Sequence, residues 1–242
     1  MAFYELANPH RFMALARLLV PAFAVLAVVL LAAGIVLGFR APPDYQQGET
    51  VRIMYIHVPA AWLALGIYTL MAIAALGTLV WRHPLADVAA KAAAPIGAAF
   101  CLICLVTGAL WGRPMWGAYW VWDARLTSML VLFLLYLGIL ALWRAIDEPG
   151  QAARAVAVLT LVGFINVPIV KYSVDWWNTL HQPASVFRLD GPAIHPAILT
   201  PLLVSAAGFA ALFVALHLAA MRNEILRRRV RTLRMLAAAE LR

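Results

Sequence analysis

Six apolar runs, each long enough or almost long enough to cross a membrane, constrain the fold of this chain more than any other feature. They occupy residues 18–39, 53–80, 92–110, 126–143, 155–171 and 196–221. A membrane-spanning helix needs ~20 apolar residues, and in lipid only helices and closed barrels satisfy the polar groups of the backbone. Charged residues make up 12% of the chain, about half of their share in soluble domains. We therefore predict an all-α polytopic membrane protein in which residues 1–242 form a single membrane domain with six transmembrane helices.

The distribution of basic residues predicts which side of the membrane each connection faces. Six spans place both termini on one side, and with that side in the cytoplasm thirteen of the 19 Lys and Arg residues are cytoplasmic. This excess agrees with the positive-inside rule, and the basic tail 222–242 makes it firm. We expect the tail to form an amphipathic helix on the anionic inner surface of the membrane; docking of a cytoplasmic partner is the alternative. The net charge of +8 is therefore no sign of nucleic-acid binding.

The content of the apolar runs disfavours several classes of protein. No acidic residue lies within a run, whereas ion-coupled transporters and proton pumps place ionisable groups inside the bilayer. The chain also has no Gly-x-x-x-x-Gly-Lys-[Ser/Thr] motif, so it is not an ATPase by itself. Cys101 and Cys104 lack the following histidine of a c-type haem motif. We expect them to be buried as small apolar residues rather than to form a redox pair.

A tryptophan-rich stretch joins the third and fourth runs, and it contains Trp111, Trp116, Trp120 and Trp122. Gly112, Pro114 and Gly117 all disfavour a regular helix there. We predict that residues 111–125 form an irregular periplasmic loop that lays indole rings side by side and lets a flat ligand approach its glycines. The alternative is an interfacial tryptophan belt, although a belt would spread its aromatic residues over many helix ends.

Three histidines fall at the level of this loop. His57 opens the second span, His181 lies in the second periplasmic segment 172–195, and His195 precedes the last span. A lone histidine is more often structural than a ligand, but a haem iron takes two axial imidazoles and its macrocycle needs flat apolar faces. Zinc would require three or four compact ligands. We expect His57 and His181 to be the axial pair of a b-type haem; His195 lies between prolines and is typical of a turn, but chemistry alone separates it only weakly from the pair.

Outer arginines and one carboxylate complete the set of candidate site residues. Arg125 and Arg52 are expected to bind the haem propionates, because guanidinium groups match carboxylates; Arg113 and Arg188 are further outer cations. Ordinary interfacial snorkelling is the alternative for Arg52 and Arg188. Asp123 is predicted to cap the fourth span, and a role in the haem site is its alternative.

The pattern Trp-Gly-x-x-x-Trp-Gly-x-x-Trp-x-Trp-Asp over residues 111–123 resembles the tryptophan-rich WWD signature of the haem-handling proteins of cytochrome c maturation. Six spans, with the signature between spans three and four and an outer histidine on each side of it, are similar to the CcmC family. The related CcmF and CcsA proteins are longer. The resemblance covers essentially the whole chain, including residues 52–59 and 176–181. Tyr119 stands where an aromatic residue, often tryptophan, is expected.

The resemblance implies a function beyond what the residues alone indicate. It implies a multi-pass protein of the bacterial inner membrane that binds haem at its periplasmic face and presents it to the haem chaperone CcmE. It also implies a complex with the ABC-type subunits CcmA and CcmB and the small membrane protein CcmD. His57 and His181 match the axial ligands of the family, and the four tryptophans with Asp123 match its signature. Such a protein positions haem for covalent attachment to the chaperone, so calling it an enzyme is a matter of definition. The alternatives are a b-type electron-transfer cytochrome and a subunit of a haem-translocating channel.

Overall fold

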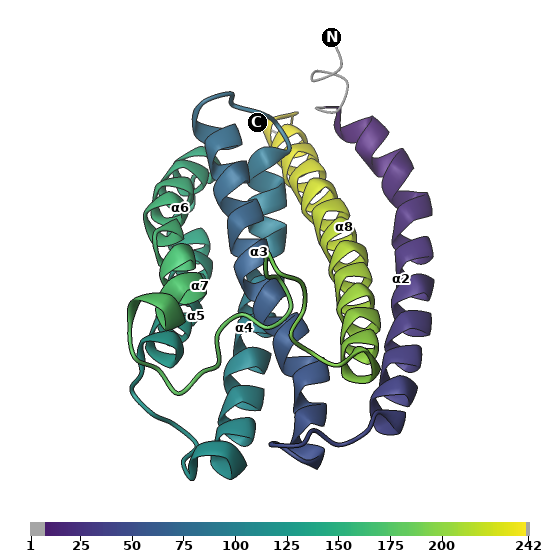
Figure 1. Ribbon diagram of the computed structural model, residues 1–242. Coiled ribbons are helices and arrows are strands. Elements are labelled where there is room, and N and C mark those ends of the chain that lie inside the picture. The colour runs from purple at the N-terminus through teal and green to yellow at the C-terminus, as the bar shows by residue number, and fades with distance from the viewer. Residues whose placement is uncertain (1–7, 241–242) are drawn as a thin grey trace.

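The computed structural model describes residues 8–240 as a bundle of long helices (Figure 1), and this described part contains no strand. Six helical segments are long and apolar enough to cross a membrane, which confirms the predicted all-α fold with six spans. The spans are α2 (Pro9–Arg40), the 3₁₀ helix η1 (Glu49–Ile53) with α3 (Met54–Leu79), α4 (Ala86–Trp116), α5 (Ala124–Ala145), α6 (Pro149–Phe164) with α7 (Asn166–Trp176), and α8 (Pro196–Glu240).

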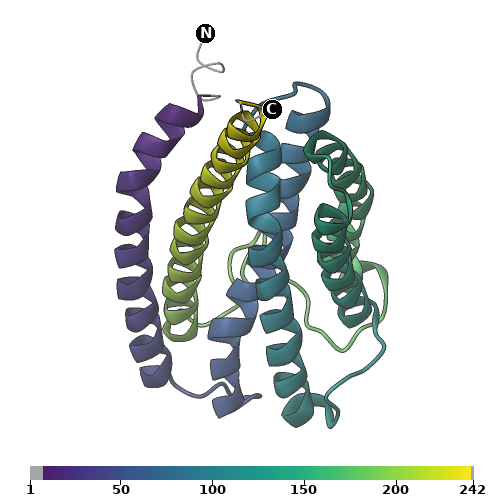
Figure 2. The same ribbon diagram turned by 180° about the vertical axis from the view of Figure 1, so that it is seen from behind.

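The helices stand in three groups (Figures 1 and 2). α2 and α8 lie along one flank, α3 and α4 form the middle, and α5, α6 and α7 form the other flank. α2 begins and α8 ends at the same end of the bundle, which we call the terminal end. At the opposite end α3 and α4 extend furthest; this is called the site end below.

Small residues allow α2 and α8 to pack closely. A Cβ atom at Gly34 would lie 2.6 Å from Ser205 Oγ, and one at Gly208 would lie 2.9 Å from the Leu31 side chain. Between helices in lipid, such small side chains provide the close backbone approach from which van der Waals attraction arises. The rest of the α2 surface is largely exposed apolar side chain, as expected of a helix that faces lipid.

Tyr136 joins two helices in the middle of the bundle. Tyr136 on α5 is fully buried, and its hydroxyl donates to the Ala64 carbonyl on α3 at 2.7 Å. The ring fits because Gly97 on α4 leaves space for it. Cys101 and Cys104 are both buried and free, which confirms the prediction that they pack as small apolar residues.

The fifth span is broken between α6 and α7. Pro168 has no N–H to donate to the Phe164 carbonyl, four residues earlier, and a proline ring clashes with that position of a regular helix. The chain therefore breaks at Ile165, and Asn166 donates from its side-chain amide to the Ser128 carbonyl on α5 at 2.9 Å. The break matters because α7 leads directly into the segment that carries His181.

The tryptophan-rich stretch is only partly a loop. The prediction of an irregular loop is wrong for residues 111–116, because α4 continues without interruption to Trp116. Gly117 then adopts a left-handed conformation with φ of 77°, and its N–H bonds to the Arg113 carbonyl, which is a common way for a helix to end. Residues 117–123 are irregular, as predicted.

The basic tail continues the last span as one helix. α8 is a single helix of 45 residues up to Glu240; the last two residues of the predicted tail, 241–242, lie outside the described part. Glu224 is only 3% exposed and accepts from Lys91 on α4 at 3.0 Å, from Arg228 at 3.0 Å, and from Arg227. Arg228 also pairs with Asp87 at 2.7 Å. These pairs tie the tail to the start of α4.

Candidate functional site

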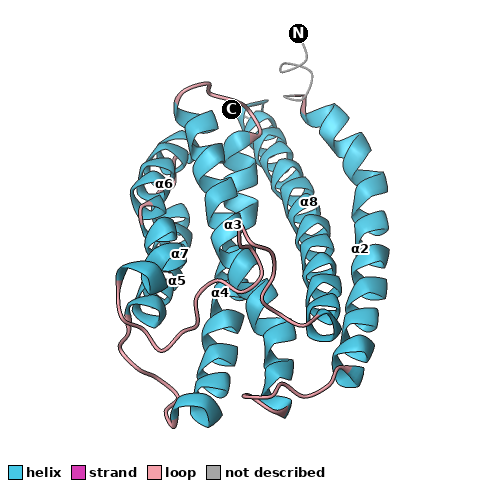
Figure 3. Ribbon diagram, viewed as in Figure 1, coloured by secondary structure: helices cyan, strands magenta, loops and turns pink. Residues whose placement is uncertain are grey.

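Segments far apart in the sequence meet at the site end. They are η1 with the start of α3, the last turns of α4, the loop 117–123 with the start of α5, and the loop 177–195. The last of these crosses the face of the bundle in front of α3 and α4 (Figure 3). It packs there through Phe187, whose ring centroid lies 5.0 Å from that of Trp62 on α3. The two predicted histidine ligands are thereby brought to the same end of the bundle.

His57 lies on the second turn of α3 and faces α4. Its Nδ1 lies 3.1 Å from the Thr107 hydroxyl, and its ring meets Trp111 edge-on with the centroids 5.5 Å apart. Trp111 is itself held by a hydrogen bond from its indole N–H to Gln47 Oε1, at 3.1 Å. His57 is thus ordered by contacts with a neighbouring helix.

His181 lies in the loop 177–195 and faces Asp123. Its Nδ1 is 3.1 Å from Asp123 Oδ2, and its ring lies edge-on to Trp116 at 4.9 Å between centroids. An ionised carboxylate can only accept, so Nδ1 carries the hydrogen and the neutral ring keeps a free lone pair on Nε2. Burial lowers the pKa of His181 below its usual value, against the opposing effect of Asp123. The ring is therefore neutral at pH 7.

Asp123 caps α5, as predicted, and it also contacts His181. Its Oδ1 accepts from the Leu126 N–H at 2.8 Å, which confirms the cap of α5. Its Oδ2 accepts from the Leu180 N–H at 3.3 Å as well as from His181. The side chain is 6% exposed. A single carboxylate therefore fixes both the start of α5 and the loop that carries His181.

Two of the four signature tryptophans each contact one of the histidines. Trp111 touches His57 and Trp116 touches His181, while Trp120 and Trp122 contact each other at 5.4 Å between centroids. The indole N–H of Trp120 is buried without a partner, and Trp122 is 75% exposed. The rings meet at steep angles rather than forming one flat shelf.

The two candidate arginines bond to residues other than the two histidines. Arg125 donates to Ser173 Oγ at 3.1 Å and to the Lys171 carbonyl at 3.3 Å, which holds α7 against α5. Arg52 pairs with Glu49 at 2.8 Å, but its Nε is buried without a partner. Of the two, Arg125 lies within electrostatic range of both His57 and His181, and these two rings lie within range of each other.

His195 has a structural role, as predicted from the prolines around it. Its Nδ1 accepts from the Ala197 N–H at 3.2 Å, and its carbonyl accepts from the N–H groups of Ile198 and Leu199. These bonds cap the start of α8. Within residues 8–240, no three His, Cys, Asp or Glu side chains are grouped closely enough to hold a metal ion.

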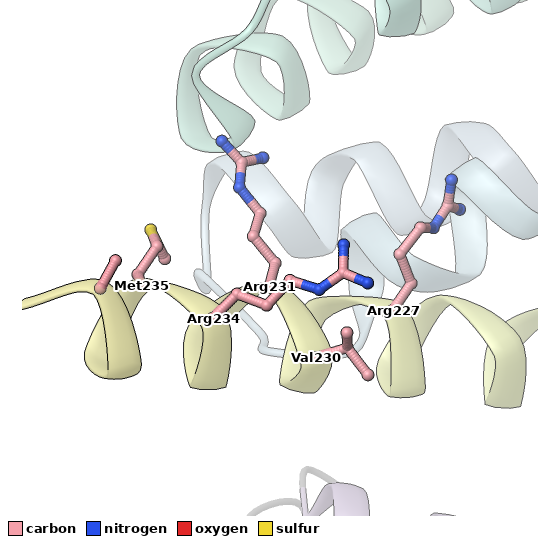
Figure 4. Close-up of a pocket in the computed structure, with 6 residues that line it drawn as sticks. Arg227, Val230, Arg231, Arg234 and Met235 are labelled. Atoms are coloured by element: carbon pink, nitrogen blue, oxygen red, sulfur yellow. The ribbon is translucent and has the colours of Figure 1, made fainter. Parts of the chain in front are cut away.

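The sequence did not predict two residues that contact the site. Thr107 and Gln47 hold His57 and Trp111, but neither belongs to the signature. The only sequence signal for Thr107 is a hydroxyl within an apolar run, four residues before Trp111. A separate surface cavity lies on the tail of α8, lined by Arg227, Val230, Arg231, Arg234, Met235 and Ala238 (Figure 4). It is at the terminal end, away from both histidines.

The fold and the site together define a polytopic helical membrane protein that presents two histidines among tryptophans at one end of its bundle. Comparison with known proteins makes the assignment specific. The chain belongs to the CcmC family, whose model, described as "Heme exporter protein C", matches residues 2–236.

Relatives of the same name are similar over nearly their whole length. The protein from Bradyrhizobium diazoefficiens is 65% identical over 241 residues, which cover 100% of this chain and 92% of the relative. The protein from Escherichia coli K12 is 50% identical over 224 residues, covering 92% and 90% respectively. The protein from Paracoccus denitrificans is 46% identical over 234 residues, covering 96% and 97%.

Proposed function

We propose that this protein binds haem at the site end through the Nε2 atoms of His57 and His181, and delivers it to the haem chaperone CcmE. One observation supports the proposal more than any other. Each imidazole contacts, through Nδ1, an oxygen atom from a separate segment, Thr107 or Asp123. Histidines that bind metals typically use the second nitrogen in this way, which orients the ring and leaves the other nitrogen for the metal.

The surrounding residues fit a haem as cargo. The edges and faces of Trp116, Trp120 and Trp122 supply apolar contact for a macrocycle, and the exposed Trp122 leaves one side open to a partner. Arg125 donates to neutral oxygen atoms and lies within electrostatic range of Asp123 and Asp175; we expect it to donate to a propionate as well. The buried, unpaired Nε of Arg52 offers a second donor. When bound, haem supplies the iron and the reactive vinyl groups, and the chain positions them.

The proposal includes an orientation and a set of partners. The terminal end, which carries the arginine-rich tail, would be cytoplasmic, and the site end would face the periplasm of a bacterial inner membrane. The tail of α8 would lie on anionic lipid, where Val230 and Met235 of the cavity in Figure 4 could enter the interface beside three arginines. CcmA, CcmB and CcmD would complete the complex.

An absorption spectrum of purified protein titrated with haem tests the axial ligands. We expect a low-spin, six-coordinate spectrum for the wild type, and its loss together with weaker binding in both His57→Ala and His181→Ala. His195→Ala is the matched control, because it removes a histidine at the same end of the bundle that only caps a helix. Wild-type spectra and affinities in both ligand variants would refute the assignment.

Mixing the haem-loaded protein with apo-CcmE tests the direction of transfer. We expect haem to move to the chaperone, with covalent attachment detected by a haem stain after denaturing electrophoresis. A b-type cytochrome would instead cycle electrons with quinone and retain its haem. A haem-translocating channel would support haem flux into sealed vesicles by this subunit alone.

A further inference from the structure

One turn of α4 surrounds the His57 ring with three different kinds of contact. Thr107 supplies a hydroxyl oxygen, Gly108 supplies bare backbone, and Trp111 supplies an aromatic edge. We propose that this turn is a seat that selects the tautomer and orientation of His57, with Thr107 as the positioning residue. Whether this arrangement strengthens haem binding rests on the proposed function. Whether it fixes the tautomer of His57 does not depend on haem.

The hydroxyl of Thr107 has one hydrogen, which it donates to a backbone carbonyl of its own helix. Thr107 Oγ1 lies 2.6 Å from the Ile103 carbonyl and 3.3 Å from the Cys104 carbonyl, and a carbonyl oxygen can only accept. Bonding of this kind, from a threonine to the preceding turn, is common in helices. Toward His57, at 3.1 Å, Thr107 therefore acts as the acceptor.

The direction of that hydrogen bond fixes the tautomer. Because Thr107 accepts, His57 Nδ1 must carry the ring hydrogen, and the Nε2 of a neutral ring then carries a free lone pair. This tautomer is the one that can offer Nε2 to a metal ion.

Gly108 and Trp111 fix where the ring stands. A Cβ atom at Gly108 would lie 2.9 Å from His57 Cε1 and 3.5 Å from its Nδ1, so a side chain there would push the ring off Thr107. Trp111 also approaches the ring, at 81° between ring planes. The position of the ring is therefore restricted by the helix that supplies its acceptor.

Replacing Thr107 by valine tests the seat, because valine keeps the shape of threonine and removes the acceptor. Thr107→Ser restores the hydroxyl. Thr69→Val is the matched control, because the Thr69 hydroxyl makes the same bond to the preceding turn, to the Leu65 carbonyl at 2.9 Å, and no ring contact.

The first measurement uses haem-free protein labelled with ¹⁵N-histidine, with the His57 signals assigned by their loss in His57→Ala. We expect the Nδ1–H tautomer in the wild type, Thr107→Ser and Thr69→Val, and a shift toward Nε2–H in Thr107→Val. An Nε2–H tautomer in the wild type, or an unchanged tautomer in Thr107→Val, would overturn the proposal.

The second measurement is the dissociation constant for haem. Loss of an outer partner of a metal-binding histidine typically weakens binding about 10–100-fold, and we expect this for Thr107→Val, with recovery in Thr107→Ser. An equal loss in Thr69→Val would show a packing effect and contradict the role of Thr107. If His57→Ala itself binds haem normally, the proposed function fails, and the tautomer measurement still decides whether the seat exists.

Discussion

Replacement of Asp123 by asparagine should separate the haem-binding role of this carboxylate from its structural role. Asparagine keeps one acceptor oxygen, and it is as good an N-cap as aspartate. The bond from the Leu126 N–H, at 2.8 Å in the wild type, should therefore survive. The second oxygen becomes an amide NH₂ group, which cannot accept from Leu180 or from His181 Nδ1.

The expected loss of haem affinity follows from the hydrogen bonds that Asp123→Asn removes. A hydrogen bond to a charged group contributes about 1.5–3 kcal/mol, and 1.4 kcal/mol corresponds to about tenfold in an equilibrium constant. Losing the carboxylate partner of His181 should thus weaken haem binding by about 10–100-fold, in the range measured for outer partners of metal ligands. Asp123→Ala removes the cap as well, and should lower the stability of the protein by about a further 1 kcal/mol.

The assay combines haem titration with thermal unfolding of the detergent-solubilised protein. We expect Asp123→Asn to bind haem weakly and to unfold near the wild-type temperature, and Asp123→Ala to be impaired in both. Glu148→Gln is the control, because Glu148 caps α6 through Gly150 and Gln151 without contacting a histidine. Wild-type haem affinity in Asp123→Asn would refute the reasoning, as would equal loss of affinity in Glu148→Gln.

Three further predictions concern packing and charge. Gly97→Ala should destabilise the bundle by about 1–3 kcal/mol, since its new methyl group would overlap the Tyr136 ring; Gly66→Ala, where a Cβ atom meets nothing within 4 Å, should unfold like the wild type in the same denaturant titration. Glu224→Ala should cost about 1.5–3 kcal/mol, because it removes the charged acceptor of Lys91 and Arg228, which are partly exposed to solvent; faster tryptic cleavage of the tail would show this, and wild-type protection would contradict it. A fluorophore attached to the tail should respond more strongly to nanodiscs with anionic lipid than to nanodiscs with neutral lipid. This difference should disappear when Arg227, Arg231 and Arg234 are all replaced by glutamine. An unchanged difference in that triple variant would contradict tail–lipid contact.

The six spans could be predicted from the sequence because lipid leaves the backbone few choices. A run of about 20 apolar residues in a bilayer has to be helical whatever its neighbours are. Asp123 was also predictable as a cap, since a short carboxylate ahead of an apolar run satisfies the free N–H groups of a helix start. The turn around His195 followed in the same way from its flanking prolines.

The end of α4 could not be predicted from local preference. Pro114 and Gly112 disfavour a helix, yet α4 runs through both. Within α4, Gly112 packs against Trp116 four residues later, with a Cβ position only 3.1 Å from the Trp116 ring, and Trp111 is held by Gln47 from another segment. The helix continues although glycine costs about 1 kcal/mol and proline about 3 kcal/mol in a helix interior, so local preference alone does not decide where it ends.

By itself the sequence determined that this chain is a six-span helical protein, because apolar length is a local property, and it predicted the candidate site residues apart from Thr107 and Gln47. Only the tertiary structure decided how these side chains are oriented. Thr107 meets His57 across 50 positions of the chain, and Asp123 meets His181 across 58. The packing of α3 against α4, and of the loop 177–195 against the start of α5, aligns each pair, and no local pattern of residues contains that geometry.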